Sequence, residues 1–382
     1  KEVCVWYCCT DVFCSKLPCR SGQNYTAVAQ VTTRRARKGF ELHYNPDSHW
    51  SAALYRGLDV IQYTDGNDKL VLNRDYLSVF RLDSMVTHNK AGTQQIKGTP
   101  TLTTKTDYQA NYPNKLQTTS YNFTSTDNTG ELCGGVVKAI PLHFKNPAQH
   151  IADLEILEKQ VHFQPVFHSR DGKAKRIECI RTDSGGDEAP CYDEVQFWWT
   201  RRHIEKPTVV ELVTSRQSGG SNLNQVELQN GCEAKARCGV FIPSTLNGSN
   251  LSQDGKLDKN RLCQNLSDAI SIYISRVQGA SCGDAKIFHC KGADLRDKLL
   301  VFIHGTKEKK LELERDYPSD YQYISTIFEV RRRHINKNIP QRYVFHLVCC
   351  YMKDCPHPVC RDEKPPSSSL CWYEGGPPVT YI

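Results

Sequence analysis

Cysteine is the residue type that most constrains how this chain can fold, because 18 of its 382 residues are cysteine. Such a density is typical of proteins whose disulfide bonds form in an oxidising compartment. The adjacent pairs, Cys8 with Cys9 and Cys349 with Cys350, fit this interpretation. Neighbouring side chains of a strand point to opposite faces, so each thiol of a pair would bond a different partner. We therefore expect disulfides that tie strands together.

Zinc is the alternative use of so many thiols, and the sequence supports it weakly. The chain contains no C-x-x-C pair, which is the spacing typical of structural zinc sites. The spacings from Cys14 to Cys19 and from Cys355 to Cys360 are permissible for a metal, but no array of histidines accompanies them in the sequence. We predict no metal site and no cofactor.

Five N-x-[ST] sequons also favour the secretory route, since they are acceptors for N-linked glycans. No run of 18 apolar residues is present, so we expect no membrane insertion. The chain begins KEVCVW without an apolar leader, and we expect that a signal peptide has been removed. The protein is expected to be secreted and partly retained at cell surfaces. The predicted glycosylation sites are Asn24, Asn122, Asn247, Asn250 and Asn265.

Strand-like segments recur along the chain, because β-branched and aromatic residues alternate with polar ones between turn residues. Residues 260–277 are ambiguous and predict a short helix running into a strand, and residues 151–161 predict another short helix. The expected fold class is all-β, with two disulfide-stapled antiparallel β-sandwich-like domains and minor helix. The strand-like segments are 69–84, 194–200, 208–215, 298–305, 323–334 and 342–352.

A polar, glycine-containing stretch, SRQSGGSNLNQ at residues 215–225, is the best candidate for a linker. A cut there leaves eight cysteines before it and ten after it, and both counts are even, as two separately closed disulfide sets require. We predict an N-terminal domain at 1–217, a linker at 218–225 and a C-terminal domain at 226–382.

Two basic clusters, RRARK at residues 34–38 and VRRRHINK at 330–337, predict a polyanionic partner. Arginine binds planar oxyanions well, and the formal net charge is +7. Outside cells that partner is a sulfated glycosaminoglycan and not nucleic acid. A solvated loop or a furin-like cleavage site stays open for the first cluster. The predicted glycosaminoglycan-binding residues are Arg34, Arg35, Arg37, Lys38, Arg331, Arg332, Arg333, His334 and Lys337.

An acidic stretch, DSGGDEAPCYDE at residues 183–194, contains five carboxylates and no cation. In a net-basic protein such a stretch predicts a basic ligand. A loop that only balances neighbouring arginines such as Arg181 and Arg201 is the open alternative. The predicted ligand-binding residues are Asp183, Asp187, Glu188, Tyr192, Asp193 and Glu194.

Enzyme motifs are weak in this sequence. GASCG at residues 279–283 matches G-x-S-x-G with Ser281 as nucleophile, but the stretch that follows makes a poor helix where a hydrolase needs one. No P-loop, H-E-x-x-H or dinucleotide-binding pattern is present. We predict that the protein is not an enzyme.

One segment, YTDGNDKLVLNRDYLSVFRLDS at residues 63–84, resembles a segment of the secreted, broad-spectrum chemokine-binding proteins of rodent gammaherpesviruses. The shared pattern is an acidic turn, a short apolar strand, then Asp-Tyr-aliphatic-Ser/Thr-Val-aromatic and a later Asp. The residues that carry it are Asp68, Leu70, Val71, Leu72, Asp75, Tyr76, Leu77, Ser78, Val79, Phe80 and Asp83.

The resemblance implies a viral decoy that sequesters host chemokines and blocks receptor engagement. Chemokines are basic, so the acidic stretch at 183–194 would be the chemokine-binding surface, and the basic clusters would tether the decoy to glycosaminoglycans. A glycan-binding adhesion or receptor ectodomain without chemokine binding is the alternative.

Overall fold

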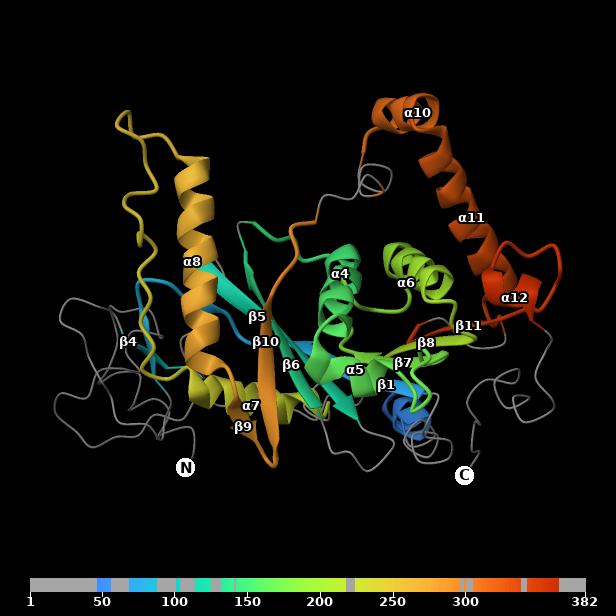
Figure 1. Cartoon of the computed structure of the whole chain (residues 1–382), viewed down its shortest axis with the longest axis horizontal. Helices are drawn as coiled ribbons and strands as arrows, with labels where there is room; N and C mark the ends of the chain where they lie inside the picture. The colour runs from blue at the N-terminus through green and yellow to red at the C-terminus, as the bar shows by residue number, and fades with distance from the viewer. Residues whose placement is uncertain are drawn as a thin grey trace, which may run out of the picture. The chain divides into compact units, whose positions relative to one another are not determined.

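The structure, a computed structural model, describes ten parts of the chain (Figure 1). They lie in one compact unit, Asp47–Ile382. The first basic cluster, residues 34–38, and the sequon at Asn24 lie outside them. The described parts are residues 47–55, 69–87, 101–103, 114–124, 132–140, 142–217, 224–295, 299, 305–337 and 342–363.

A mixed sheet of nine strands forms the centre of the described residues (Figure 1). Its order is β11-β8-β7-β1-β5-β6-β10-β9, and β2 pairs with β5. Strands β1, β7 and β8 run parallel, as do β6 and β10, whereas β5 is antiparallel to both of its neighbours β1 and β6. Strands β3 and β4 form a separate pair. The strands are β1 (Lys69–Tyr76), β2 (Phe80–Arg81), β3 (Met85–Thr87), β4 (Thr101–Thr103), β5 (Lys115–Thr124), β6 (Leu132–Ala139), β7 (Ile177–Thr182), β8 (Val210–Ser215), β9 (Ala280–Cys282), β10 (Ala285–Lys291) and β11 (Val344–Val348).

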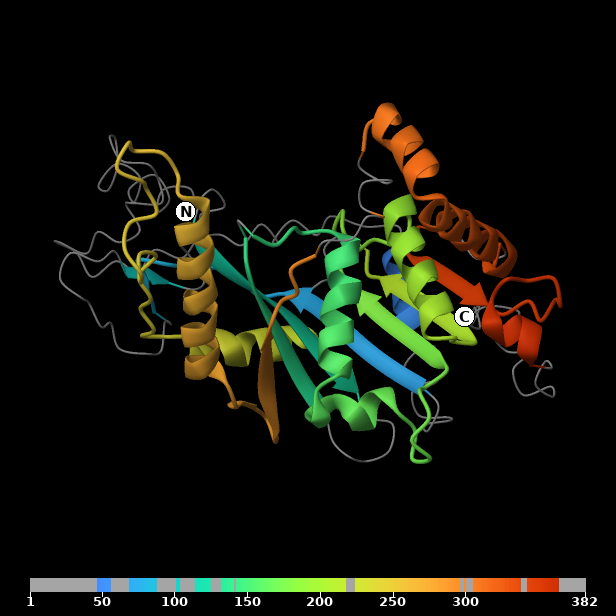
Figure 2. The same cartoon turned by 45° about the horizontal axis from the view of Figure 1, so that its top comes forward.

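Helices pack on both faces of this sheet (Figure 2). Side chains of α4, α5, α6 and α11 share one core with Leu72, Phe123 and Val213 of the strands. On the other face, Leu54 of a helix at residues 48–55 packs with Val71, and α8 packs over β5 and β6. The other helices are α4 (Pro147–Glu158), the 3-10 turn η2 (Val161–Phe163), α5 (Gln164–Phe167), α6 (Asp193–Glu205), α7 (Val226–Ala236), α8 (Lys259–Val277), α10 (Lys307–Asp316), α11 (Pro318–His334) and α12 (Pro358–Asp362). None of the helices described is both long enough and apolar enough to span a bilayer.

The predicted all-β fold and the β-sandwich architecture are wrong, because the structure is a mixed α/β sheet covered by helices. The predicted strand at 194–200 is helix α6. Its buried residues Val195, Trp198, Trp199 and Arg202 recur at helical spacing, and both tryptophans are in the core. A short apolar run fits either period, so burial on one helical face decided the outcome.

Two further predicted strands are also helical. Residues 323–334 belong to α11, which begins with Pro318 at its first turn and ends in basic residues, an arrangement that favours a helix at both ends. Residues 260–277 form α8 throughout, because the side chain of Asp258 caps its first turn and Leu266, Ile270 and Tyr273 line its buried face.

The disulfide prediction is wrong for the described residues, where all twelve cysteines are free thiols. The two sulfurs of Cys350 and Cys360 are 3.9 Å apart, far beyond a disulfide bond of about 2.05 Å. An even count of cysteines therefore does not decide how the thiols are used.

Most of the predicted linker, residues 218–223, lies outside the described parts of the chain, but the strands before and after it in the sequence belong to one sheet. Strand β8, which precedes it, pairs with β11, which follows it. Strand β6 likewise pairs with β10. Strands from both of the predicted domains therefore build the same sheet.

Candidate active site

Two aspartates lie at the carboxyl ends of the central strands β1 and β7. The two strands are parallel neighbours, and their last matched residues are Asn73 and Arg181. Asp75 follows Asn73 by two residues, and Asp183 follows Arg181 by two residues. If the register continues, both aspartates lie on the same face of the sheet. Ligands of open α/β sheets bind outside the carboxyl ends of strands, where the strand order reverses. Here that point is β1, which lies between β5 and β7.

Helix α7 adds a third carboxylate, Glu227, in its first turn. Two amide side chains hold the start of this helix against β1. Nδ2 of Asn224 donates to the carbonyl oxygen of Arg74 (3.2 Å), and Nδ2 of Asn230 donates to Oδ2 of Asp75 (3.1 Å). The carboxyl groups of Glu227 and Asp75 each influence the pKa of the other. Three carboxyl groups from separate parts of the chain, those of Asp75, Asp183 and Glu227, therefore lie near enough to influence one another's pKa values.

Burial and mutual repulsion raise the pKa values of this cluster. Burial raises the pKa of Asp75 to about 8, and the charges of Asp183, Glu188 and Glu227 add to the shift. Burial also raises the pKa of Glu227, with the charge of Asp183 as the next cause. At neutral pH the cluster therefore retains a proton on Asp75, which a bound cation would displace.

The available donor atoms suit a hard divalent cation such as Mg²⁺ or Mn²⁺, which takes oxygen ligands. Besides the carboxylates, the side chains of Asn224 and Asn230 are only 5 % and 6 % exposed. Their amide oxygens accept no hydrogen bond from the residues that the structure describes. Buried amide oxygens normally have a hydrogen-bond partner, and for Asn230 it is the amide nitrogen, not the oxygen, that contacts Asp75.

The loop that carries the second aspartate is held from the opposite face of the sheet. Nη2 of Arg74 lies 2.9 Å from Oε2 of Glu188, and both side chains are buried. Oδ2 of Asp187 accepts a hydrogen bond from the hydroxyl of Tyr76 (2.8 Å) and lies 2.9 Å from Nε2 of His150. These contacts fix the loop after β7 against β1 and α4.

Buried polar contacts likewise anchor the helix that presents the third carboxylate. Glu233 of α7 accepts hydrogen bonds from Oγ1 of Thr118 (2.8 Å) and the hydroxyl of Tyr273 (3.0 Å), and it lies 3.2 Å from Nε2 of His289. One helix turn earlier, Nε2 of Gln229 donates to a carbonyl oxygen of β6 (2.7 Å). Helix α7 is therefore fixed by β5, β6, β10 and α8 together.

The structure places the predicted chemokine-binding residues in different settings. Asp183 is part of the carboxylate cluster, whereas Asp187 and Glu188 point inward to partners on β1 and α4. Tyr192 is exposed just before α6, and Glu194 is half-buried in the first turn of α6. Chemokine binding remains a prediction that none of these contacts tests.

The predicted glycosaminoglycan residues of the second cluster lie at the carboxyl end of α11. Nη2 of Arg331 donates to Oδ1 of Asp193 (2.6 Å), and Nη1 of Arg333 lies 2.9 Å from Asp354. His334 is buried. Glycosaminoglycan binding also remains a prediction. The exposed members of the cluster are Arg332 and Lys337.

The predicted glycosylation sites differ in accessibility. Asn122 on β5 and Asn265 on α8 are 2 % and 0 % exposed, which leaves no room for a glycan on either side chain in the folded chain. Asn247 and Asn250 are partly exposed in the loop before α8.

Sequence reasoning missed Asp75 and Glu227 as site residues. A local signal did exist, since Asp75 and Asp183 each come at the end of an apolar, strand-like run. Only the register of two strands far apart in the sequence shows that these ends meet. Comparisons with protein-family models, curated proteins and solved structures find no match to this chain.

Proposed function

We propose that this protein is a divalent-metal-dependent phosphoryl-transfer enzyme that acts on the backbone of nucleic acid, as a nuclease or strand transferase. The observation that carries the proposal is the position of Asp75 and Asp183 at the carboxyl ends of two neighbouring parallel strands, with Glu227 of α7 near enough to influence the pKa of Asp75. Sites that hold two divalent cations are the catalytic apparatus of many nucleases and polymerases.

The three carboxylates would hold the metal. When bound, divalent cations activate the attacking oxygen and stabilise charge on the phosphate. Glu227 is the exposed member of the three carboxylates, so it is accessible to an attacking water and is the group that would accept the proton of that water. Asp75 and Asp183 are held by the strand register, so little reorganisation is needed on binding.

The segment before α4, on the opposite face of the sheet from Asp75, has groups that suit a polyanion with aromatic bases. Lys145 is exposed, and its Nζ lies 3.6 Å from Asp187 and 4.2 Å from the centroid of the Tyr76 ring. The neighbouring Phe144 is 68 % exposed. A lysine can neutralise a backbone phosphate while an adjacent aromatic ring stacks on a base. The net charge of +7 favours the same kind of partner.

The earlier exclusion of nucleic acid depended on secretion, which was inferred largely from disulfides. Because the described thiols are free, that inference loses its main support. A nucleic-acid substrate is therefore consistent with the chemistry of the described residues.

The test uses the purified full chain with end-labelled single-stranded DNA, double-stranded DNA and RNA, each with Mg²⁺ or Mn²⁺. We expect metal-dependent cleavage or strand joining of at least one substrate. Asp75→Asn, Asp183→Asn and Glu227→Gln should each lower the rate by about 10³-fold, a loss of the size seen when a group that stabilises transition-state charge is removed. Glu314→Gln on the exposed face of α10 is the matched control and should retain full activity.

Calorimetric titration with Mn²⁺ tests the site without relying on the choice of substrate. Wild type and Glu314→Gln should bind Mn²⁺, and Asp183→Asn should bind it at least about tenfold more weakly. Equal Mn²⁺ affinity in all three proteins, together with no reaction on any substrate, would overturn the proposal.

A further inference from the structure

Three cysteines and a histidine gather where α11 ends, close to the end of β11. One ring nitrogen of His334 and the sulfurs of Cys350, Cys355 and Cys360 all lie within 4.8 Å of one another. His334 is the last residue of α11, Cys350 follows β11, and Cys360 lies on α12. His334, Cys355 and Cys360 are buried, so these groups face one another and not solvent.

The separations of these four atoms match a tetrahedral zinc site. Zinc–sulfur bonds of about 2.3 Å and zinc–nitrogen bonds of about 2.0 Å place tetrahedral ligands about 3.8 Å apart for two sulfurs and about 3.5 Å apart for sulfur and nitrogen. The sulfurs of Cys350 and Cys360 are 3.9 Å apart. Nε2 of His334 lies 3.3 Å from the sulfurs of both Cys355 and Cys360.

Neighbouring groups orient the proposed ligands. Nδ1 of His334 lies 2.9 Å from Nε2 of His203, whose own Nδ1 lies 2.6 Å from Oγ1 of Thr208. The backbone N–H of Tyr351 donates to the sulfur of Cys360 (3.3 Å). A histidine that binds a metal through one nitrogen typically has a hydrogen-bond partner at the other. His334 has that partner in His203, which leaves Nε2 directed at the sulfurs.

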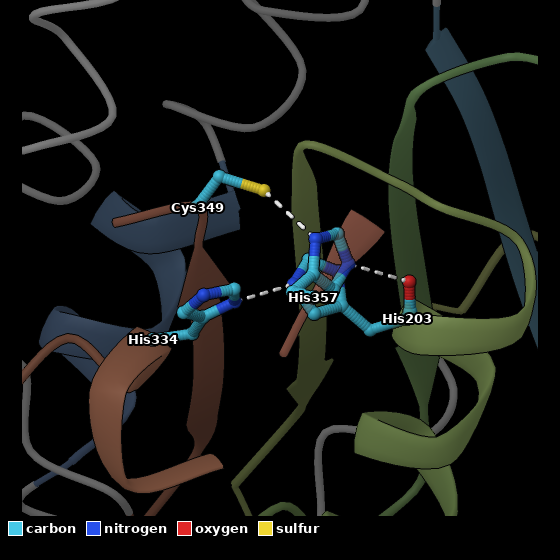
Figure 3. A group of neighbouring side chains, drawn as sticks. All are labelled: His203, His334, Cys349 and His357. Carbon is cyan, nitrogen blue, oxygen red and sulfur yellow. Dashed lines mark hydrogen bonds between the residues drawn. The ribbon is translucent and has the colours of Figure 1, made fainter. Parts of the chain in front are cut away.

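A second group of potential ligands, His203, His334, Cys349 and His357, surrounds the same histidine (Figure 3). The members of this second group already have hydrogen-bond partners, most of them within the group. Nε2 of His357 lies 3.0 Å from the carbonyl oxygen of His203, and its Nδ1 lies 3.6 Å from the sulfur of Cys349. The sulfur of Cys349 also lies 3.5 Å from the carbonyl oxygen of Thr208. His203, Cys349 and His357 therefore form the wall around the ligand group.

From this geometry we infer that His334, Cys350, Cys355 and Cys360 bind one structural Zn²⁺. Thiolate and imidazole ligands select zinc over the hard cations that oxygen clusters bind. Four protein ligands in a buried setting leave no open position for a substrate, as is typical of a structural site. The metal would connect the end of α11 to the segment after β11, in which α12 is the one helix of the described residues 349–363.

A disulfide between Cys350 and Cys360 is the competing use of the same thiols. It would require the two sulfurs to move from 3.9 Å to about 2.05 Å, and it would leave Cys355 beside His334 without a partner. The two outcomes differ in metal content and in the number of free thiols, so both can be measured on the native protein.

The experiment measures zinc by mass spectrometry in the full chain purified under reducing conditions without added metal. Cys355→Ser and Cys360→Ser should each contain about one equivalent less zinc per chain than wild type. Cys349→Ser, in the wall, and Cys263→Ser, on the exposed face of α8, should lose none. If a ligand variant does not fold, the wild type still serves, because a mercurial that modifies thiols should release the same equivalent.

Substitution of Co²⁺ into wild type should add the visible absorption of a tetrahedral thiolate site, and Cys355→Ser should lack it. Equal zinc in wild type and Cys355→Ser would overturn the inference. A Cys350–Cys360 disulfide in peptide mapping, or zinc lost from Cys349→Ser and retained by Cys350→Ser, would do so as well.

Discussion

The carboxylate cluster and the cysteine–histidine cluster are opposite kinds of site on one sheet. The first offers oxygen atoms, and its member Glu227 is exposed. The second offers sulfur and nitrogen atoms, and His334 is 2 % exposed. Hard oxygen ligands with solvent access suit an exchangeable Mg²⁺ or Mn²⁺, whereas a closed soft site suits a permanent Zn²⁺. The difference indicates chemistry at the first site and stability at the second.

Supporting contacts differ in the same way. Charged groups on the opposite face of the sheet, such as the buried Arg74–Glu188 pair, hold the loop that carries Asp183. The carboxylates of the first cluster still repel one another. The proposed ligand His334 instead contacts His203, which in turn contacts the hydroxyl of Thr208. We therefore expect the carboxylate cluster, whose charges repel one another, to bind and release a cation as the pH changes. We expect the cysteine–histidine cluster, whose groups have hydrogen-bond partners, to retain its metal.

The largest expected effect is a difference in the free energy of unfolding between variants of the two sites. Cys360→Ala should lower the free energy of unfolding by about 3 kcal/mol or more, because structural zinc binding is coupled to folding. Asp183→Asn should leave the stability unchanged or raise it, because it removes a repelling charge. Chemical denaturation of both variants measures the difference. A stable Cys360→Ala would show that the second cluster has no structural metal.

An intermediate effect is the pH dependence of the first site. The pKa of Asp75 is about 8 in the folded chain, against an ordinary value of 3.8. Between these two pH values the folded chain holds a proton that the unfolded chain lacks. Without metal, the contribution of Asp75 to the free energy of unfolding is therefore fully present below about pH 4 and is lost as the pH rises through about 8. Denaturation without metal at about pH 5 and about pH 8 should show this loss, and Asp75→Asn should reduce it.

Mn²⁺ must displace the same proton, so its affinity should rise about tenfold per pH unit up to about pH 8. Calorimetric titration at about pH 6 and about pH 8 measures this slope. Zinc content of the second site should not change over the same range. An Mn²⁺ affinity that is independent of pH would contradict a binding role for Asp75.

The smallest expected effect concerns substrate and not metal. Lys145→Ala should weaken binding of nucleic acid several-fold for every sequence and reduce the slope of log affinity against log salt by about one, because one phosphate contact is lost. Fluorescence anisotropy at several salt concentrations measures both. Lys256→Ala, in an exposed loop before α8, is the matched control, and an equal loss in both variants would place the nucleic acid elsewhere.

Several features were predictable because they depend on neighbours in the sequence. Strand β1 was expected within residues 69–84, β8 within 208–215 and α4 near 151–161, and each is present. Helix α6 was not, because Val195, Phe197 and Trp199 also alternate like a strand. Only packing of Trp198 and Arg202 against the sheet distinguishes the two periods. Asp183 was predicted to bind a chemokine, which stays a prediction, and the groups that influence its charge in the structure lie on other elements.

By itself, the sequence determined where aspartates follow apolar runs, where helices begin at residues such as Asp258, and that many thiols and cations are present. The tertiary structure alone decided how those groups are combined. The register of β1 on β7 brings Asp75 to Asp183, and the packing of α11 brings His334 to Cys355 and Cys360. The reason is physical: a metal site depends on separations of a few ångströms between groups that the chain's local preferences do not connect.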